Sequence, residues 1–489
     1  MTTMTKRPNI VFILTDDHAA NATGCYGSRV NETPRIDEIA ASGARFDTAL
    51  VTNALCTPSR ATFLTGTYSH VNNVTTLATP LEAGQLTFIS ELKAAGYRTA
   101  LFGKWHLGHG EGFDPEHFDH WEVLPDQGEY FDPEFFTASG AVRHEGYVTD
   151  IVTDLALDWI DEQTEQSDAP WCVLIWHKAP HRPWEPDPKH ADLYTTEIPL
   201  PETFFDDYTG RGTPAHHATM RIADYLTDID LKEHPSEELS YTQLAQWKYQ
   251  RYMQDYLRCV ASVDDNVGRV TDHLRARGDH EDTLTIYASD QGFYLGEHGW
   301  FDKRFMYEES LRMPFVLSYP ARVAPAQAID ALVSNVDLAQ TILDFAGVEQ
   351  PSTMQGRSLT SLLASPTRAA TQQSVRDEHY YRFYEHDDHM HHVWAHYGLR
   401  TERYKLIYYY ADGLGLPNTS DMSYPPEWEL FDLERDPYEL QSVHLDPEYA
   451  EIRHELTLRL WDTQHQLGDT PYHLQPVPQG RNNDSHHTA

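Results

Sequence analysis

The chain has 489 residues, 40% of them hydrophobic, and is therefore long enough to bury a large core. Its 75 acidic and 37 basic residues give a formal charge of −38, which disfavours a nucleic acid as partner. The four cysteines are widely spaced without a CxxC pair, which excludes a zinc knuckle and a dense disulfide scaffold. If the substrate is an anion, the chain must also contain a local cluster of cations that reverses this field.

The N-terminal segment has a basic start and one short apolar run, residues 10–14, which ends at two aspartates. A run of this length is too short for a signal sequence or a membrane span. We therefore expect a cytoplasmic protein with no membrane partner. The sequence does not fix the oligomeric state, and a homo-oligomer stays open.

Four apolar segments end abruptly in polar functional groups: NIVFILTDD, YRTALFGKWH, WCVLIWHKAPH and LTIYASDQG. Such runs without polar alternation are typical of strands buried on both faces of a parallel sheet. Helical patterns fall between them: TPRIDEIAASG with a Thr33 cap and a closing Gly43, TFISELKAAG, and residues 243–277 and 337–346. This alternation predicts an α/β fold in which the polar groups that follow the strands meet in one site.

The pattern changes after Ser365. Residues 398–410 and 427–433 are typical of strands in an antiparallel sheet, and the periodic segment AEIRHELTLRLWDTQHQL is typical of a helix. These features predict a catalytic domain over residues 1–370, with its boundary between 365 and 376, and a smaller C-terminal α+β domain over 371–478. The polar residues 479–489 have the composition of a disordered tail.

The segment CTPSRATFLTG, residues 56–66, places a cysteine next to a predicted helix start, because Pro58 suits the first helical turn. A lone cysteine is most often a small buried hydrophobe. At a helix N-terminus, however, backbone N–H groups favour negative charge, and composition alone describes Cys56 as an activated thiolate.

Cys56, Pro58 and Arg60, followed by the Leu-Thr-Gly of residues 64–66, resemble the signature of the sulfatase family. In that family a formylglycine-generating enzyme oxidises the cysteine to an aldehyde. One hydroxyl of the hydrated aldehyde attacks the sulfur of a sulfate ester, and the other then loses its proton to expel sulfate. The resemblance implies an alkaline-phosphatase-like α/β fold with a mostly parallel sheet. It also implies that Cys56 is a precursor, that Pro58 and Arg60 are read by the modifying enzyme, and that Arg60 also braces the diol.

The acidic pair Asp16 and Asp17 in TDDH could be an N-cap cluster, the usual role of aspartate after a strand. Together with Asp290 and Gln291 in SDQG, it forms a set of hard oxygen ligands that suits Ca²⁺ or Mg²⁺ better than Zn²⁺. The resemblance implies Ca²⁺ at these positions. Gln291 stands where sulfatases often carry asparagine or histidine.

Four cationic or titratable residues match sulfatase positions that hold sulfate oxygens and move protons: Lys104, His106, His181 and Lys303. Taken singly, each would more often be a surface or structural residue. The resemblance places Lys104 and His106 on the diol side, and His181 and Lys303 beside the leaving oxygen. His181 is the candidate general acid because imidazole titrates near neutral pH.

Four further residues are weaker candidates for the substrate side of the site. We expect His177 to buttress the loop that carries His181, and His298 either to border the substrate pocket or to support its turn. The segment from Asp290 to Pro314, together with HYGLRTERYKL, resembles the branch that includes N-acetylglucosamine-6-sulfatases. That narrower resemblance makes Asp302 and His396 candidates for binding sugar hydroxyls. For the histidine-rich run 385–396 we prefer a substrate-rim loop to a transition-metal tract, because its spacing fits no ordered metal site.

The sequence therefore predicts a sulfate ester hydrolase acting on a small sulfated sugar or oligosaccharide, such as 6-O-sulfated N-acetylglucosamine. Small substrates are favoured because the acidic surface should repel long sulfated polymers. One alternative is a phosphonate monoester or phosphodiester hydrolase of the same superfamily. The other is a non-catalytic protein that binds sulfated glycans.

Overall fold

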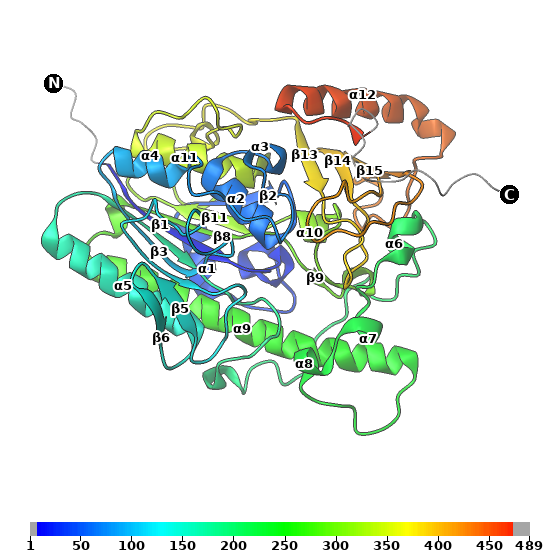
Figure 1. Cartoon of the computed structure of the whole chain (residues 1–489), viewed down its shortest axis with the longest axis horizontal. Coiled ribbons are helices and arrows are strands. Elements are labelled where there is room, and N and C mark those ends of the chain that lie inside the picture. The colour runs from blue at the N-terminus through cyan, green and yellow to red at the C-terminus, as the bar shows by residue number, and fades with distance from the viewer. Residues whose placement is uncertain (1–6, 473–489) are drawn as a thin grey trace.

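The computed structural model describes residues 7–472 and is built around a ten-stranded sheet (Figure 1). The strand order is β12-β2-β11-β8-β1-β7-β3-β4-β5-β6. Its strands are β1 (Asn9–Thr15), β2 (Ala44–Leu50), β3 (Arg98–Lys104), β4 (His120–Leu124), β5 (Glu134–Thr137), β6 (Gly140–Arg143), β7 (Trp171–Trp176), β8 (Thr283–Ser289), β11 (Phe315–Ser318) and β12 (Gln327–Ser334). Most of the central pairings are parallel, and β11 runs antiparallel to both of its neighbours. The predicted α/β fold with a mostly parallel sheet is confirmed.

The four apolar segments that predicted buried strands are β1, β3, β7 and β8, which lie side by side and run parallel. Their register aligns the ends of the strands: Thr15 pairs with Ser289, and Trp176 pairs with both Leu14 and Gly103. The polar residues that follow these strands therefore emerge at one edge of the sheet.

Helices cover both faces of the sheet, which explains why its central strands lack polar alternation. The helices are α1 (Pro34–Ser42), α2 (Cys56–Thr65), α3 (Ser69–Asn72), α4 (Phe88–Ala94), α5 (Val148–Gln166), α6 (Thr213–His217), α7 (Ile222–Tyr225), α8 (Asp228–Leu231), α9 (Tyr241–Arg277), α10 (Glu308–Leu311), α11 (Leu338–Ala346) and α12 (Ala450–Leu467). Phe12 and Leu14 pack in the core cluster that includes α2, α4 and α11, whereas Val11 and Ile13 pack in the cluster of α1, α5 and α9. Figure 1 shows these two helical layers on opposite sides of the sheet.

The four helices predicted from the sequence are present as α1, α4, α9 and α11, but the cap of α1 differs from the prediction. Thr33 occupies the N-cap position without a capping hydrogen bond, because its hydroxyl group accepts from the Gly24 amide and donates to Asp37. The carboxylate of Asp264, on α9, instead accepts the amide hydrogens of Arg35 and Ile36 at 3.0 and 2.9 Å. A tertiary contact thus replaces the predicted local one.

A separate antiparallel sheet follows near the C-terminus, in the order β13-β14-β15-β16. Its strands are β13 (Glu378–Phe383), β14 (His396–Thr401), β15 (Tyr404–Tyr409) and β16 (Glu427–Asp432), and α12 packs against them. The predicted antiparallel strands and terminal helix are confirmed, and β13 is additional. The boundary between 365 and 376 stays a prediction, and the predicted tail 479–489 lies outside the described residues, as does the end of the 371–478 unit.

Within residues 7–472, no helix has both the length and the apolar character needed to cross a membrane. Each of the four cysteines is a free thiol, and Cys25 is the one that is not fully buried. A two-stranded hairpin of β9 (Tyr294–Leu295) and β10 (Phe301–Asp302) carries Lys303 toward the end of the large sheet.

Candidate active site

Two pairs of polar residues, three carboxylates and one amide, meet where the adjacent strands β1 and β8 end. Asp16 and Asp17 follow β1, and Asp290 and Gln291 follow β8. The Asp17 amide donates to Asp290 Oδ1 at 3.2 Å. Asp16, Asp17 and Asp290 are buried, and each offers a carboxylate oxygen within 4.8 Å of the other two. The structure thus brings together the residues predicted as metal ligands.

The donor atoms at this edge fit a hard divalent cation. Gln291 Nε2 donates to Asp17 Oδ1 at 2.6 Å, while its buried Oε1 has no hydrogen-bond partner among residues 7–472. Burial, followed by repulsion from Asp16, raises the pKa of Asp290 to about 7. Burial likewise raises the pKa of Asp17 to about 6, against the lowering effect of Lys303. A bound cation would favour the charged form of these crowded carboxylates. Three carboxylates suit Ca²⁺ or Mg²⁺, and a turn of the Gln291 amide, whose Nε2 now faces Asp17, would add its oxygen to them.

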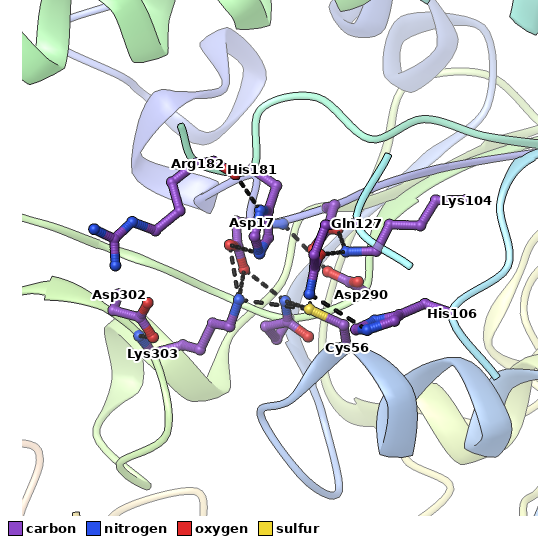
Figure 2. A network of polar contacts seen from close by, with 12 residues as sticks. Asp17, Cys56, Lys104, His106, Gln127, His181, Arg182, Asp290, Asp302 and Lys303 are labelled. Carbon is purple, nitrogen blue, oxygen red and sulfur yellow. Dashed lines mark hydrogen bonds and ion pairs between the residues drawn. The ribbon is translucent and has the colours of Figure 1, made fainter. Parts of the chain in front are cut away.

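Cys56 is the first residue of α2, and its thiol points into this cluster (Figure 2). Its Sγ lies 3.1 Å from Asp16 Oδ1, 3.5 Å from Lys303 Nζ and 3.6 Å from Gln291 Nε2. Burial and then the Asp16 charge raise the pKa of the thiol, so Cys56 stays protonated despite its place at a helix N-terminus. The site therefore disfavours the activated thiolate that composition alone suggested.

Arg60 lies one turn further along α2 and is completely buried. Its Nε and Nη2 contact Asp290 Oδ2 at 3.0 and 2.9 Å, and its Nη1 donates to the carbonyl oxygen of Lys104 at 2.8 Å. The guanidinium also stacks over the Trp176 ring, 5.3 Å from its centroid. Arg60 thus joins the ends of β3, β7 and β8 to the helix that carries Cys56.

One side of Cys56 is lined by Lys104 and His106. Lys104 Nζ contacts Asp16 Oδ2 and the side-chain oxygen of Gln127. His106 Nδ1 lies 3.4 Å from the hydroxyl group of Thr57, and its Nε2 lies 3.3 Å from Gln127 Nε2. Burial, reinforced by Lys104, lowers the pKa of His106 to about 4, so this imidazole is neutral at pH 7. The sequence did not indicate Gln127, because a single amide side chain after a strand belongs to no recognisable motif.

The other side is lined by His181 and Lys303 (Figure 2). Lys303 Nζ lies 2.7 Å from both carboxylate oxygens of Asp17. His181 Nδ1 donates to the carbonyl oxygen of Arg182 at 2.6 Å, and His181 Nε2 lies 3.8 Å from Asp17 Oδ2. Burial lowers the pKa of His181 well below its usual value. The hydroxyl group of Tyr130, which no sequence motif indicated, donates to the His181 carbonyl oxygen at 2.7 Å and fixes this loop.

His177 and His298 lie in different surroundings. The His177 amide donates to the carbonyl oxygen of Leu14 at 2.8 Å, which anchors the loop containing His181 to β1. His298 is buried, and its Nδ1 lies 3.0 Å from Asp206 Oδ2 and 3.2 Å from Arg211 Nη1. These contacts place His298 in a neighbouring polar cluster that supports its turn.

The two candidate sugar-binding residues, Asp302 and His396, lie in environments that differ from each other. Asp302 precedes Lys303 and contacts Arg304 Nη1 and His391 Nε2, the latter at 3.4 Å. His396 is fully buried on β14, and its Nδ1 donates to the carbonyl oxygen of Trp394 at 2.7 Å. The His396 ring packs among aromatic side chains of the small sheet and its neighbours, namely Phe305, Tyr381, Phe383 and Tyr409.

A pocket of about 390 Å³ opens beside His106 and Thr57. Its walls include the apolar side chains of Leu77, Trp105 and Phe136. An apolar and aromatic wall next to a cluster of charges suits a sugar ring bearing a charged substituent.

Comparison with known proteins agrees with this geometry. The family model described as "Sulfatase" matches residues 8–348, which is more than half of the chain. The chain belongs to the sulfatase family. A second family model, "N-sulphoglucosamine sulphohydrolase, C-terminal", matches residues 296–466 of this sulfatase. Sulfatases typically use a formylglycine and a metal ion, in keeping with the cysteine and carboxylates assembled here.

Two curated relatives have names that specify N-acetylglucosamine 6-sulfate groups as their target. The N-acetylglucosamine-6-O-sulfatase of Bacteroides thetaiotaomicron is 41% identical over 95% of this chain and 88% of its own length. The human N-acetylglucosamine-6-sulfatase is 28% identical over 77% of this chain and 68% of its own length.

A solved structure described as a complex with its substrate D-glucosamine-2-N,6-O-disulfate superimposes with a TM-score of 0.87. It is 39% identical and covers 96% of this chain and 100% of its own. A phosphonate monoester hydrolase from Silicibacter pomeroyi is 21% identical with a TM-score of 0.70, covering 94% of this chain and 96% of its own, a likeness of fold alone.

Proposed function

We propose that this sulfatase removes the 6-O-sulfate from N-acetylglucosamine or a related glucosamine in a small sugar. The observation that carries the proposal is the position of Cys56 Sγ, which lies within 3.6 Å of Asp16, Gln291 and Lys303 at one end of the central strands. The sugar is inferred from the 41% identical N-acetylglucosamine-6-O-sulfatase and from the structural relative that binds a glucosamine disulfate.

Two groups complete the proposed site. Asp16, Asp17 and Asp290, with the unpartnered oxygen of Gln291, would hold Ca²⁺, with Mg²⁺ as the alternative, and the ion would supply positive charge to the sulfuryl group. Formylglycine made from Cys56 by a formylglycine-generating enzyme would supply a nucleophilic hydroxyl group.

The two buried lysines supply the local positive charge that the acidic chain otherwise lacks. Lys303 Nζ lies 3.5 Å from Cys56 Sγ, and Lys104 Nζ reaches Asp16 on the other side. Both ammonium groups are already oriented by carboxylates, so they can stabilise charge on the sulfuryl group with little rearrangement. Arg60 takes a positioning role, since it holds Asp290 and the backbone of Lys104.

His181 and His106 are placed for opposite proton transfers. The Nδ1–H group of His181 donates a hydrogen bond to the Arg182 carbonyl oxygen, which leaves Nε2 facing the site. A bound anionic sulfate would favour the imidazolium form, so that Nε2 can protonate the departing sugar oxygen. His106 is neutral at pH 7 and lies on the Thr57 side of Cys56, where it can accept a proton.

The experiment is a substrate panel on enzyme produced together with a formylglycine-generating enzyme. N-acetylglucosamine-6-sulfate, an aryl sulfate and phenyl phosphonate are compared by kcat/KM, with Cys56→Ala as the control. We expect the sugar sulfate to be preferred and the control to be inactive. A preference for the phosphonate would overturn the proposal. So would an intact thiol at Cys56 in protein isolated from its native host, which would instead favour a sulfated-glycan binding protein.

A further inference from the structure

A second group of metal-ligating side chains lies outside the active site, where α6 meets the histidine-rich loop 385–396 near the C-terminal sheet (Figure 1). Asp387 Oδ1 lies 3.1 Å from His217 Nε2 and 2.8 Å from His392 Nδ1. The three ligand atoms all lie within 4.8 Å of one another. None of these residues takes part in the sulfatase site described above.

We propose that His217, Asp387 and His392 bind a divalent transition-metal ion such as Zn²⁺, with water as a fourth ligand. Ligands about 2.0–2.1 Å from a tetrahedral zinc ion are roughly 3.3 Å apart. The separations of 3.1 and 2.8 Å from Asp387 Oδ1 are close to that value, and the ligand atoms of His217 and His392 lie within 4.8 Å of each other, so the ion would draw the two imidazoles together. Two imidazoles with one carboxylate select a borderline ion over Ca²⁺.

The surroundings orient these ligands as a metal site requires. The second oxygen of Asp387 accepts a hydrogen bond from the hydroxyl group of Tyr424 at 2.9 Å. Tyr424 stacks on Trp394 with ring centroids 4.6 Å apart, and the His217 ring lies 5.2 Å from the Tyr424 ring. Such outer partners fix the orientation of metal ligands. The His392 side chain is 38% exposed, which leaves an entry path from solvent.

The bound ion would fasten two chain segments that already touch. The amide and hydroxyl groups of Thr219, which follows α6, donate to the carbonyl oxygens of His391 and Met390 at 2.8 and 2.7 Å. Within the same loop, His391 Nε2 lies 3.4 Å from Asp302 Oδ2, and Asp302 Oδ1 accepts from the Lys303 amide at 2.8 Å. The ion would thus hold in place the loop that contacts the residue preceding Lys303.

The test uses a Cys56→Ser variant saturated with Ca²⁺, because Asp16, Cys56 and His181 also form a group that could capture a thiophilic ion. Isothermal titration with Zn²⁺ should show one tight equivalent per chain. His217→Ala and His392→Ala should each lose this equivalent, whereas Tyr424→Phe should weaken it about tenfold. His216→Ala and His389→Ala replace exposed histidines close to the ligands and should keep it.

The proposal is overturned if the Ca²⁺-saturated protein binds no Zn²⁺, or if His217→Ala and His216→Ala bind it equally well. If the ligand variants fail to fold, Co²⁺ added to the Cys56→Ser protein provides a second test. A visible absorption spectrum of tetrahedral Co²⁺, displaced by one equivalent of Zn²⁺, supports the site, and the absence of that spectrum contradicts it.

Discussion

Replacing Lys303 with methionine tests whether its charge acts in catalysis or only stabilises the fold. Lys303 Nζ lies 2.7 Å from both oxygens of Asp17. At this distance the Coulomb attraction between the two charges is about 6 kcal/mol for an effective dielectric constant of about 20. Methionine keeps an unbranched side chain as far as Cε and removes the charged ammonium group. Loss of one partner of a buried ion pair should destabilise the metal-free protein by about 3–5 kcal/mol.

The same substitution should lower kcat by about 100- to 1,000-fold, the usual cost of removing one preorganised group that stabilises developing charge. Calcium binding should move in the opposite direction. Because the Lys303 ammonium repels a cation bound at Asp17, Lys303→Met should bind Ca²⁺ as tightly as the parent or more tightly. Kinetics on matured enzyme and calorimetric Ca²⁺ titration measure the two effects separately.

Lys405→Met is the matched control. Lys405 is also fully buried, and its Nζ lies 2.7 Å from Glu439 Oε1 and 2.9 Å from Glu308 Oε1, within the C-terminal sheet region. We expect a comparable loss of stability but an unchanged kcat per folded molecule. Equal losses of kcat in the two variants, or loss of Ca²⁺ binding in Lys303→Met, would refute the role assigned to Lys303.

Three further predictions concern the metal, the surface charge and the sugar. Ca²⁺ should raise Tm more at about pH 8 than at about pH 5, because the pKa values of Asp17 and Asp290, raised to about 6 and 7, make the metal-free fold lose stability as the pH rises through them. A Ca²⁺-induced shift that is larger at the lower pH would contradict the assigned ligands. Added salt should increase turnover of sulfated polymers relative to the monosaccharide, because salt screens the charge of −38, whereas identical salt responses would remove that electrostatic argument. Asp302→Asn should raise the KM for N-acetylglucosamine-6-sulfate by about tenfold and leave aryl sulfate kinetics nearly unchanged, and equal effects on both substrates would show that Asp302 does not bind the sugar.

The sequence predicted those features that depend on local patterns. Uninterrupted apolar runs identified the central strands, and the polar residues at the ends of these runs predicted that Asp16 and Asp290 meet at one edge of the sheet. Pro58 correctly predicted a helix at Cys56. In each case the signal was contained in a few consecutive residues whose burial dictated their conformation.

Features that depend on distant partners could not be predicted in this way. The N-terminus of α1 is capped by Asp264, 228 positions away from Ile36, and no local pattern predicts this contact. Similarly, the histidine-rich loop shows no metal spacing by itself, because the third ligand, His217, lies 170 positions from Asp387. His396 opens a segment that resembles N-acetylglucosamine-6-sulfatases, yet its position on β14 buries the ring among aromatic side chains.

A crystal structure of matured protein grown with Ca²⁺ tests the central claim most directly. We expect one calcium ion bound by Asp16, Asp17, Asp290 and Gln291, next to a hydrated aldehyde at residue 56. An unmodified cysteine in protein that hydrolyses sulfate esters, or calcium bound elsewhere with this carboxylate cluster empty, would contradict it.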